Sequence, residues 1–127
     1  MANELILIIE DDEKNRKLVR DLLQFSGYRT LEAVSGEDGI TLAAEHKPDL
    51  ILMDYQLPGI DGIEAFRRIR GDAATAHIPI LAVTASAMPE EAKKMKEAGF
   101  DGFLTKPINV KGFVQAVADI FSAKAAK

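Results

Sequence analysis

The chain has 127 residues, of which 47% are hydrophobic and 28% charged, a composition typical of one folded domain of a soluble protein. It contains no cysteine, which excludes disulfides, zinc–thiolate sites, iron–sulfur clusters and thiol catalysis. The formal net charge of −4 argues against nonspecific binding to nucleic acid. No apolar run is long enough for a secretory signal or a membrane span, so we expect a cytosolic protein with a single domain over residues 1–127.

Short aliphatic runs alternate along the chain with segments in which apolar residues recur at helical spacing. The first run, Leu5–Ile9, is rich in β-branched residues and predicts a buried strand. The apolar residues of the next segment recur at helical spacing, and Gly27 ends that helix. In chain order the first part of the pattern predicts a strand over 5–9, a helix over 13–25, a strand over 28–34, a helix over 35–45 and a strand over 49–53.

The second part of the chain continues the same alternation after two turn dipeptides, Pro58-Gly59 and Asp61-Gly62. The pattern predicts a helix over 63–70, a strand over 80–83, a helix over 89–98, a short strand over 102–104 and a last helix with an apolar face from Phe113 to Phe121. Residues 122–127, which are rich in alanine and lysine, are expected to be a fraying helix end.

These elements form five β-then-α units in about 120 residues. The predicted strands are aliphatic throughout rather than alternating, as a parallel sheet covered by helices on both faces requires. With right-handed crossovers, the fold class is α/β with a doubly wound parallel sheet. Any ligand site is then expected at the carboxyl ends of the strands.

Polar side chains follow four of the five predicted strands, at the edge of the sheet where the carboxyl ends of the strands lie. Glu10-Asp11-Asp12 follow the first strand, Asp54 the third, Thr84 the fourth and Lys106 the fifth. Taken singly, several of them could be helix caps or surface residues. Asp54 is harder to explain structurally, because it directly follows an aliphatic strand, where a partly desolvated carboxylate costs several kcal/mol. We therefore expect a functional site.

The acidic residues of this site predict a divalent cation. Carboxylates about 4 Å apart repel by about 4 kcal/mol per pair at an effective dielectric constant of about 20, so they need a positive partner. Oxygen ligands without histidine or cysteine select magnesium, calcium or manganese over zinc. Because a few carboxylates leave coordination positions open for water and phosphate oxygens, Mg²⁺ is the expected ion and Mn²⁺ the alternative.

A carboxylate beside a divalent cation, a hydroxyl group and a lysine is a combination suited to phosphoryl transfer. Asp54 is expected to act as the nucleophile and form an aspartyl phosphate. The metal, Thr84 and Lys106 would each meet charge that develops on the equatorial phosphoryl oxygens. The backbone N–H groups that follow Asp54 and Thr84, the second being that of Ala85, could complete the cradle.

With these motifs in place, the chain resembles the receiver domain of bacterial two-component response regulators over essentially its whole length. The matching segments are Ile-Ile-Glu-Asp-Asp at 8–12, Asp-Leu-Ile-Leu-Met-Asp at 49–54, Leu-Pro-Gly-Ile-Asp-Gly at 57–62, Thr-Ala at 84–85 and Lys-Pro at 106–107. The resemblance implies a flavodoxin-like fold with five helices and the strand order 2-1-3-4-5 of the chemotaxis receiver, which is a standard example of this topology.

The resemblance also assigns roles around the acidic site. Asp54 matches the phosphoacceptor, and Glu10 and Asp11 match the acidic pair that binds Mg²⁺ together with Asp54. The main-chain carbonyl of Gln56 is implied as a further ligand. Asp12 is then left at the start of the following helix. Family members often have Asp where this chain has Glu10, and the longer side chain could bind the metal through water.

Two further positions match the residues that change conformation in the family. Thr84 matches the hydroxyl that moves toward the phosphoryl group, and Phe103 matches the aromatic residue whose rotamer follows. A plain core aromatic is the alternative explanation for Phe103, and many members carry Tyr there. Lys106 matches the phosphate-binding lysine.

The implied function is that of a stand-alone receiver rather than an enzyme acting on separate substrates. A phosphohistidine of a sensor histidine kinase or a histidine phosphotransfer domain donates its phosphoryl group to Asp54, and the domain catalyses this transfer and its own slow dephosphorylation. The expected output is binding of a protein target to the helix over 89–98, the strand over 102–104 and the last helix. Donor docking is expected around residues 14–16, and neither nucleic acid nor membrane is an expected partner.

Three alternatives remain at this point. The chain could be a receiver excised from a hybrid histidine kinase or a larger regulator. A phosphatase with an aspartate nucleophile would need a second aspartate two residues after Asp54, where this chain has Gln56. A flavodoxin-type carrier would need a loop rich in Gly, Ser or Thr after the first strand, whereas the acidic residues 10–13 would repel a flavin phosphate.

Overall fold

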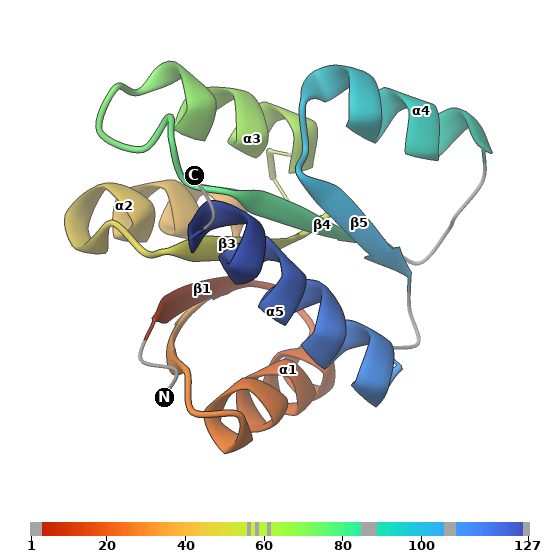
Figure 1. Ribbon diagram of the computed structural model, residues 1–127. Helices are drawn as coiled ribbons and strands as arrows, with labels where there is room; N and C mark the ends of the chain where they lie inside the picture. Colours follow the sequence, from red (N-terminus) through yellow and green to blue (C-terminus); the bar gives the residue numbers. More distant parts are fainter. Residues whose placement is uncertain are drawn as a thin grey trace.

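A computed structural model describes residues 4–55, 57, 59–60, 62–84, 89–105 and 109–125. Strands and helices alternate through these residues (Figure 1). In chain order they are β1 (Leu5–Ile9), α1 (Glu13–Phe25), β2 (Arg29–Ala33), α2 (Gly36–His46), β3 (Leu50–Asp54), α3 (Gly62–Gly71), β4 (Ile80–Thr84), α4 (Pro89–Ala98), β5 (Gly102–Thr105) and α5 (Val110–Ala125).

The five strands form one parallel sheet in the order β2-β1-β3-β4-β5. This order confirms the topology that the resemblance implies, and the parallel arrangement confirms the fold class that the aliphatic strands predict. β1 and β3 are hydrogen-bonded neighbours with Ile9 opposite Met53, although 43 residues separate the two along the chain. The residues that follow these strands therefore meet at one edge of the sheet.

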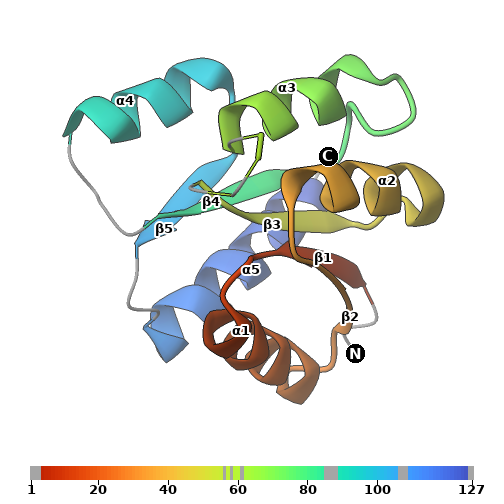
Figure 2. The same ribbon diagram turned by 180° about the vertical axis from the view of Figure 1, so that it is seen from behind.

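The helices cover the two faces of the sheet unequally. Helices α1 and α5 lie on one face, and α2, α3 and α4 lie on the other (Figures 1 and 2). Side chains of alternate strand residues point to opposite faces, which divides the apolar core into two parts. The part beneath α1 and α5 contains Ile6, Ile8, Leu50, Leu52, Leu81, Phe113 and Val117. The part beneath the other three helices contains Leu7, Ile9, Ile51, Met53, Ile80, Ala82 and Phe66.

The strand and helix boundaries differ from the sequence prediction by one or two residues at several places. The third and fourth strands each extend one residue further than predicted, so Asp54 and Thr84 are the last residues of β3 and β4. Both polar residues therefore remain within the sheet ladder, opposite Val83 and Thr105 respectively. Helix α5 extends to Ala125, into the segment for which the sequence predicts a fraying end.

Near the amino ends of β4 and β5, Arg70 and Asp101 connect the two segments that precede these strands. The Asp101 Oδ2 atom accepts a hydrogen bond from the Ile80 N–H (2.7 Å) and lies 2.8 Å from Arg70 Nη2. Arg70 also donates to the main-chain carbonyls of Ala76 and Ile78. Its guanidinium group lies over the ring of Phe66. These contacts fix the edge of the sheet opposite to the acidic residues.

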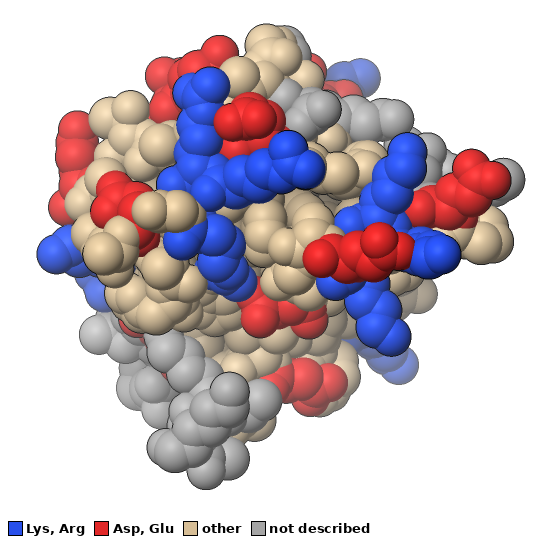
Figure 3. All heavy atoms as spheres, turned by 90° about the horizontal axis from the view of Figure 1, so that it is seen from above, with Lys and Arg blue, Asp and Glu red and all other residues tan. Residues whose placement is uncertain are grey.

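On the face formed by α2, α3 and α4, basic and acidic side chains alternate (Figure 3). Two of the pairs are one helical turn apart, Arg68 with Glu64 and Lys93 with Glu97. Such exposed pairs contribute at most a few tenths of a kcal/mol each, about 0.3–0.5. Within the described ranges, no helix is long and apolar enough to cross a membrane.

Candidate functional site

Three carboxylates converge at the carboxyl edge of the sheet, two from the residues directly after β1 and one from the last residue of β3. Each of Glu10, Asp11 and Asp54 offers an oxygen atom, and these oxygens all lie within 4.8 Å of one another. Glu10 and Asp54 are each only 5% exposed, whereas Asp11 is open to solvent. The convergence follows from the pairing of β1 with β3. Ile9 lies opposite Met53, and the residues that follow these two, Glu10 and Asp54, are both acidic.

Glu10 is held by hydrogen bonds at its N–H, its carbonyl group and its side chain. Its N–H donates to the Ala33 carbonyl on β2 (3.0 Å), which continues the sheet ladder by one residue. Its Oε2 atom accepts from the Asp12 N–H (3.1 Å), and its carbonyl oxygen accepts from Arg16 Nη1 (3.1 Å). The longer glutamate side chain thus folds back over the loop that follows β1.

Asp12 has a structural role instead. Its Oδ1 atom accepts hydrogen bonds from the backbone N–H groups of Lys14 (2.8 Å) and Asn15 (3.2 Å), so Asp12 is the N-cap of α1. This geometry satisfies two of the N–H groups that a helix start leaves without an intrahelical partner. The expectation that Asp12 lies at the start of the helix is confirmed.

The turn after Asp54 is fixed by backbone contacts. The Tyr55 N–H donates to the Val83 carbonyl on β4 (2.8 Å), and the Tyr55 carbonyl accepts from the Gly62 N–H at the start of α3 (3.1 Å). Gly62 lies so close to this turn that a Cβ atom there would be 2.8 Å from the Tyr55 carbonyl oxygen and 3.1 Å from that of Asp54. Only glycine allows the helix to start against the backbone of the site.

The Gly62→Ala substitution is therefore expected to destabilise the protein by about 1–3 kcal/mol, because the new methyl group meets main-chain atoms that cannot rotate away. Chemical denaturation of the variant measures this change. Gly71→Ala in the same helix is the matched control, since a Cβ at Gly71 meets nothing within 4 Å. The control is expected to be neutral or slightly stabilising. Equal destabilisation by both substitutions would contradict the close-contact explanation.

The donor set fits a hard divalent cation. At the observed limit of 4.8 Å, two carboxylate charges repel by about 3–4 kcal/mol at an effective dielectric constant of about 20. A bound cation reverses the sign of this interaction. All three side chains offer oxygen, and the exposure of Asp11 leaves one side of the group open to water and phosphate oxygens, an arrangement that suits Mg²⁺.

Thr84 lies at the end of β4, the strand next to β3, and is fully buried. Thr84 and Asp54 therefore end neighbouring strands, and their membership of one site stays a prediction. Three other residues expected at the site, Gln56, Ala85 and Lys106, lie outside the described residues. Their positions stay predictions.

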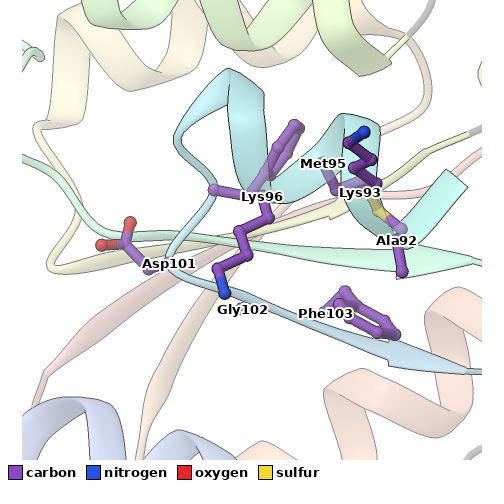
Figure 4. Close-up of a pocket in the computed structure, with 8 residues that line it drawn as sticks. Ala92, Lys93, Met95, Lys96, Asp101, Gly102 and Phe103 are labelled. Atoms are coloured by element: carbon purple, nitrogen blue, oxygen red, sulfur yellow. The ribbon is translucent and has the colours of Figure 1, made fainter. Parts of the chain in front are cut away.

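Phe103 lies on β5 and is 40% exposed, so it does not have the core position that was its alternative explanation. Its ring lines a hollow of about 490 Å³ between α4 and β5. In Figure 4 the ring lies beneath α4, and the Lys96 side chain reaches from that helix toward Gly102. The movement of this ring stays a prediction.

Sequence reasoning missed two residues that shape the site. Gly62 entered the prediction as part of a turn dipeptide and of the matching segment 57–62, and Arg16 as a reference point for the acidic pair and as part of the expected docking segment, but neither was predicted to contact the backbone of the site. The interaction of Arg16 with the Glu10 carbonyl depends on how α1 packs on β1. The spacing of Arg16, four residues after the helix cap, places it on the first turn but does not by itself indicate its partner.

Comparison with known proteins gives consistent results. The family model for the response regulator receiver domain matches residues 6–118. The polar-differentiation response regulator DivK of Brucella ovis is 43% identical over 112 residues, which are 88% of this chain and 91% of DivK. Among solved structures, the chemotaxis response regulator CheY4 of Vibrio cholerae matches with a TM-score of 0.87 and 26% identity, over 92% of this chain and 98% of CheY4.

A second solved structure bears on the acidic group. The receiver domain of the sensor histidine kinase PA1611 from Pseudomonas aeruginosa PAO1 matches with a TM-score of 0.83 and 31% identity, over 90% of this chain and 93% of that one. That structure has a magnesium ion coordinated in its active-site cleft.

Proposed function

Because the chain belongs to the response regulator receiver family, we propose that it accepts a phosphoryl group on Asp54 from a phosphohistidine. The observation that carries this proposal is the convergence of Glu10, Asp11 and Asp54, with oxygen atoms within 4.8 Å of one another. The donor is a sensor histidine kinase or a histidine phosphotransfer domain, the partner class with which receivers of this family interact.

In the transfer, a carboxylate oxygen of Asp54 forms a bond to phosphorus while the bond from phosphorus to the donor's imidazole nitrogen breaks. The imidazole nitrogen keeps the electron pair of the broken bond. A bound Mg²⁺ supplies positive charge toward the phosphoryl oxygens. Glu10 and Asp11 would hold that ion beside the nucleophile, and the Gln56 carbonyl is proposed as a further ligand.

The remaining charge on the phosphoryl oxygens is met by groups from β4 and β5. We assign the Thr84 hydroxyl as one hydrogen-bond donor, supported by its position at the end of the neighbouring strand. The Lys106 ammonium group and the Ala85 N–H are proposed as two more donors. These contacts exist only after phosphorylation, so they favour a different arrangement of the edge of the sheet.

The signalling surface is proposed to be α4, β5 and α5. Phe103 is partly exposed beside the hollow that α4 residues Lys93 and Lys96 also line (Figure 4). An inward movement of the ring after Thr84 moves would change the shape of this surface. A protein target that distinguishes the two shapes then reads the phosphorylation state. Donor docking near residues 14–16 stays a separate proposal.

The proposal is tested by incubating the protein with acetyl phosphate and measuring its intact mass. One phosphoryl adduct is expected in the presence of Mg²⁺, and none after chelation of divalent ions with EDTA. Mn²⁺ is expected to replace Mg²⁺, because it accepts the same oxygen ligands. An adduct that forms equally well in EDTA would contradict the role of the acidic group. Steady release of inorganic phosphate from phosphomonoesters would instead favour the phosphatase alternative.

A further inference from the structure

Arg16 connects the acidic loop to two other elements of the fold. From the first turns of α1, its Nη1 atom donates to the Glu10 carbonyl oxygen (3.1 Å), and its Nε atom donates to Glu32 Oε1 on β2 (3.1 Å). The Arg16 side chain is only 17% exposed. A single guanidinium group therefore joins α1, the end of β1 and β2.

The hydrogen bond from Arg16 to the Glu10 carbonyl constrains the path of the backbone after β1. A peptide group is planar, so the orientation of the Glu10 carbonyl sets the direction in which Asp11 leaves the strand. The N–H of Glu10 is already fixed by Ala33, and its carboxylate by the Asp12 N–H. Arg16 fixes the carbonyl, the third polar group of the same residue.

Glu32 fixes the orientation of the Arg16 guanidinium group, because its carboxylate accepts the hydrogen bond from Arg16 Nε. Its carboxylate also lies 3.3 Å from Arg20 Nη1, and the hydrogen bond from Arg20 to Glu32 raises the pKa of the Arg20 guanidinium. Glu32 is thus bound by two cations, one turn apart on α1. The hydrogen bonds described for Arg20 go to Glu32 and Asp21, whereas Arg16 also bonds the Glu10 carbonyl, which distinguishes the two roles.

We propose that Arg16 is a positioning residue for the metal site: it holds the Glu10–Asp11 peptide so that both carboxylates face Asp54. This inference rests on the proposed function, because it requires that Glu10 and Asp11 hold Mg²⁺. Residues that orient metal ligands commonly change metal affinity by about 10–100-fold when they are removed.

The sign of the effect separates positioning from electrostatics. A cation near three carboxylates competes with Mg²⁺ for the same negative charge, so an electrostatic effect alone would make Mg²⁺ bind more tightly once Arg16 is removed. Loss of positioning makes Mg²⁺ bind more weakly. Lysine keeps the charge but has one compact ammonium group, which cannot reproduce the two contacts of the planar guanidinium fork.

The experiment is a Mg²⁺ titration of the wild-type protein and of Arg16→Ala, Arg16→Lys and Arg20→Ala variants, followed by backbone amide resonances. We expect Arg16→Ala to weaken Mg²⁺ binding about tenfold and Arg16→Lys to weaken it severalfold. Arg20→Ala, which also removes a partner of Glu32, is the matched control and is expected to stay within about twofold of the wild type. Thermal unfolding in EDTA measures any loss of stability separately.

A second measurement uses phosphorylation by acetyl phosphate. The rate for Arg16→Ala is expected to return to the wild-type rate when the Mg²⁺ concentration is raised about tenfold, because only the occupancy of the site has changed. A variant with a purely structural defect would unfold at a lower temperature but bind Mg²⁺ with unchanged affinity.

The outcomes separate the two proposals. Unchanged or tighter Mg²⁺ binding by Arg16→Ala overturns the positioning role and leaves the proposed function intact. Equal weakening by Arg16→Ala and Arg20→Ala also overturns it, because the effect would then come from Glu32. Absence of Mg²⁺ binding by the wild-type protein overturns the metal site itself, and the inference with it.

Discussion

The Asp54→Asn variant is expected to take up no phosphoryl group from acetyl phosphate, even at high Mg²⁺ concentration. An amide has no anionic oxygen to attack phosphorus, so uptake should fall by at least about 100-fold. In metal-free solution the same variant is expected to be more stable than the wild type by about 1–3 kcal/mol, since one of three mutually repelling carboxylates has lost its charge. Intact mass measures the first effect, and chemical denaturation in EDTA measures the second.

Asp12→Asn is the matched control for both measurements. Asparagine caps a helix as well as aspartate does, so the start of α1 should be preserved, and Asp12 lies outside the group of three carboxylates. The control is expected to be phosphorylated normally and to show little change in stability. A phosphoryl adduct that persists in Asp54→Asn would mean that another side chain is the acceptor. A loss of stability in the metal-free variant would contradict the repulsion argument.

The second large effect concerns the coupling between Thr84 and Phe103. The chain contains no tryptophan, so a Phe103→Trp substitution introduces a single tryptophan, at a position that is 40% exposed. Phosphorylation is expected to shift the emission of this tryptophan to shorter wavelength, because the ring moves away from solvent. When Thr84→Val is added, phosphorylation should still occur but most of the shift should be lost, since no hydroxyl moves toward the phosphoryl group.

Thr105→Val serves as the control for this experiment. Thr105 lies opposite Thr84 in the pairing of β4 with β5 but is exposed, and the same change of side chain there should leave the fluorescence shift intact. A full shift in the Thr84→Val background would show that the ring moves independently of this hydroxyl. A shift absent from Phe103→Trp alone would contradict the inward movement.

The aliphatic runs made much of this fold predictable from the sequence. Leu5–Ile9 and the residues before Asp54 are apolar at every position, which only a strand covered on both faces explains, and both are buried strands. The site was predictable for the same reason. The carboxyl ends of parallel strands meet at one edge, so the acidic residues after the first and third strands had to be neighbours once those strands were adjacent.

Other features depend on contacts that local patterns do not encode. The strand order was predicted only from the resemblance. The aliphatic residues of a strand do not indicate which other strand lies beside it in the sheet. The exposure of Phe103 reflects its place on β5 beside the hollow beneath α4, whereas its residue type suggests burial. The hydrogen bond from Arg16 to the Glu10 carbonyl joins a side chain to the main chain, and such pairs leave no pattern of complementary residues.

The interior position of β1 has a consequence for biosynthesis. The ribosome makes β1 before the other four strands of this sheet, yet in the finished sheet β1 lies between β2 and β3. A nascent chain that has emerged only as far as Ala33 can pair β1 on one side, and the other side stays an unpaired aliphatic edge until β3 emerges. Such an edge can pair with other chains, so the interval before β3 emerges is the stage of synthesis most exposed to aggregation. Arrival of β3 closes this edge and, in the same step, brings Asp54 beside Glu10.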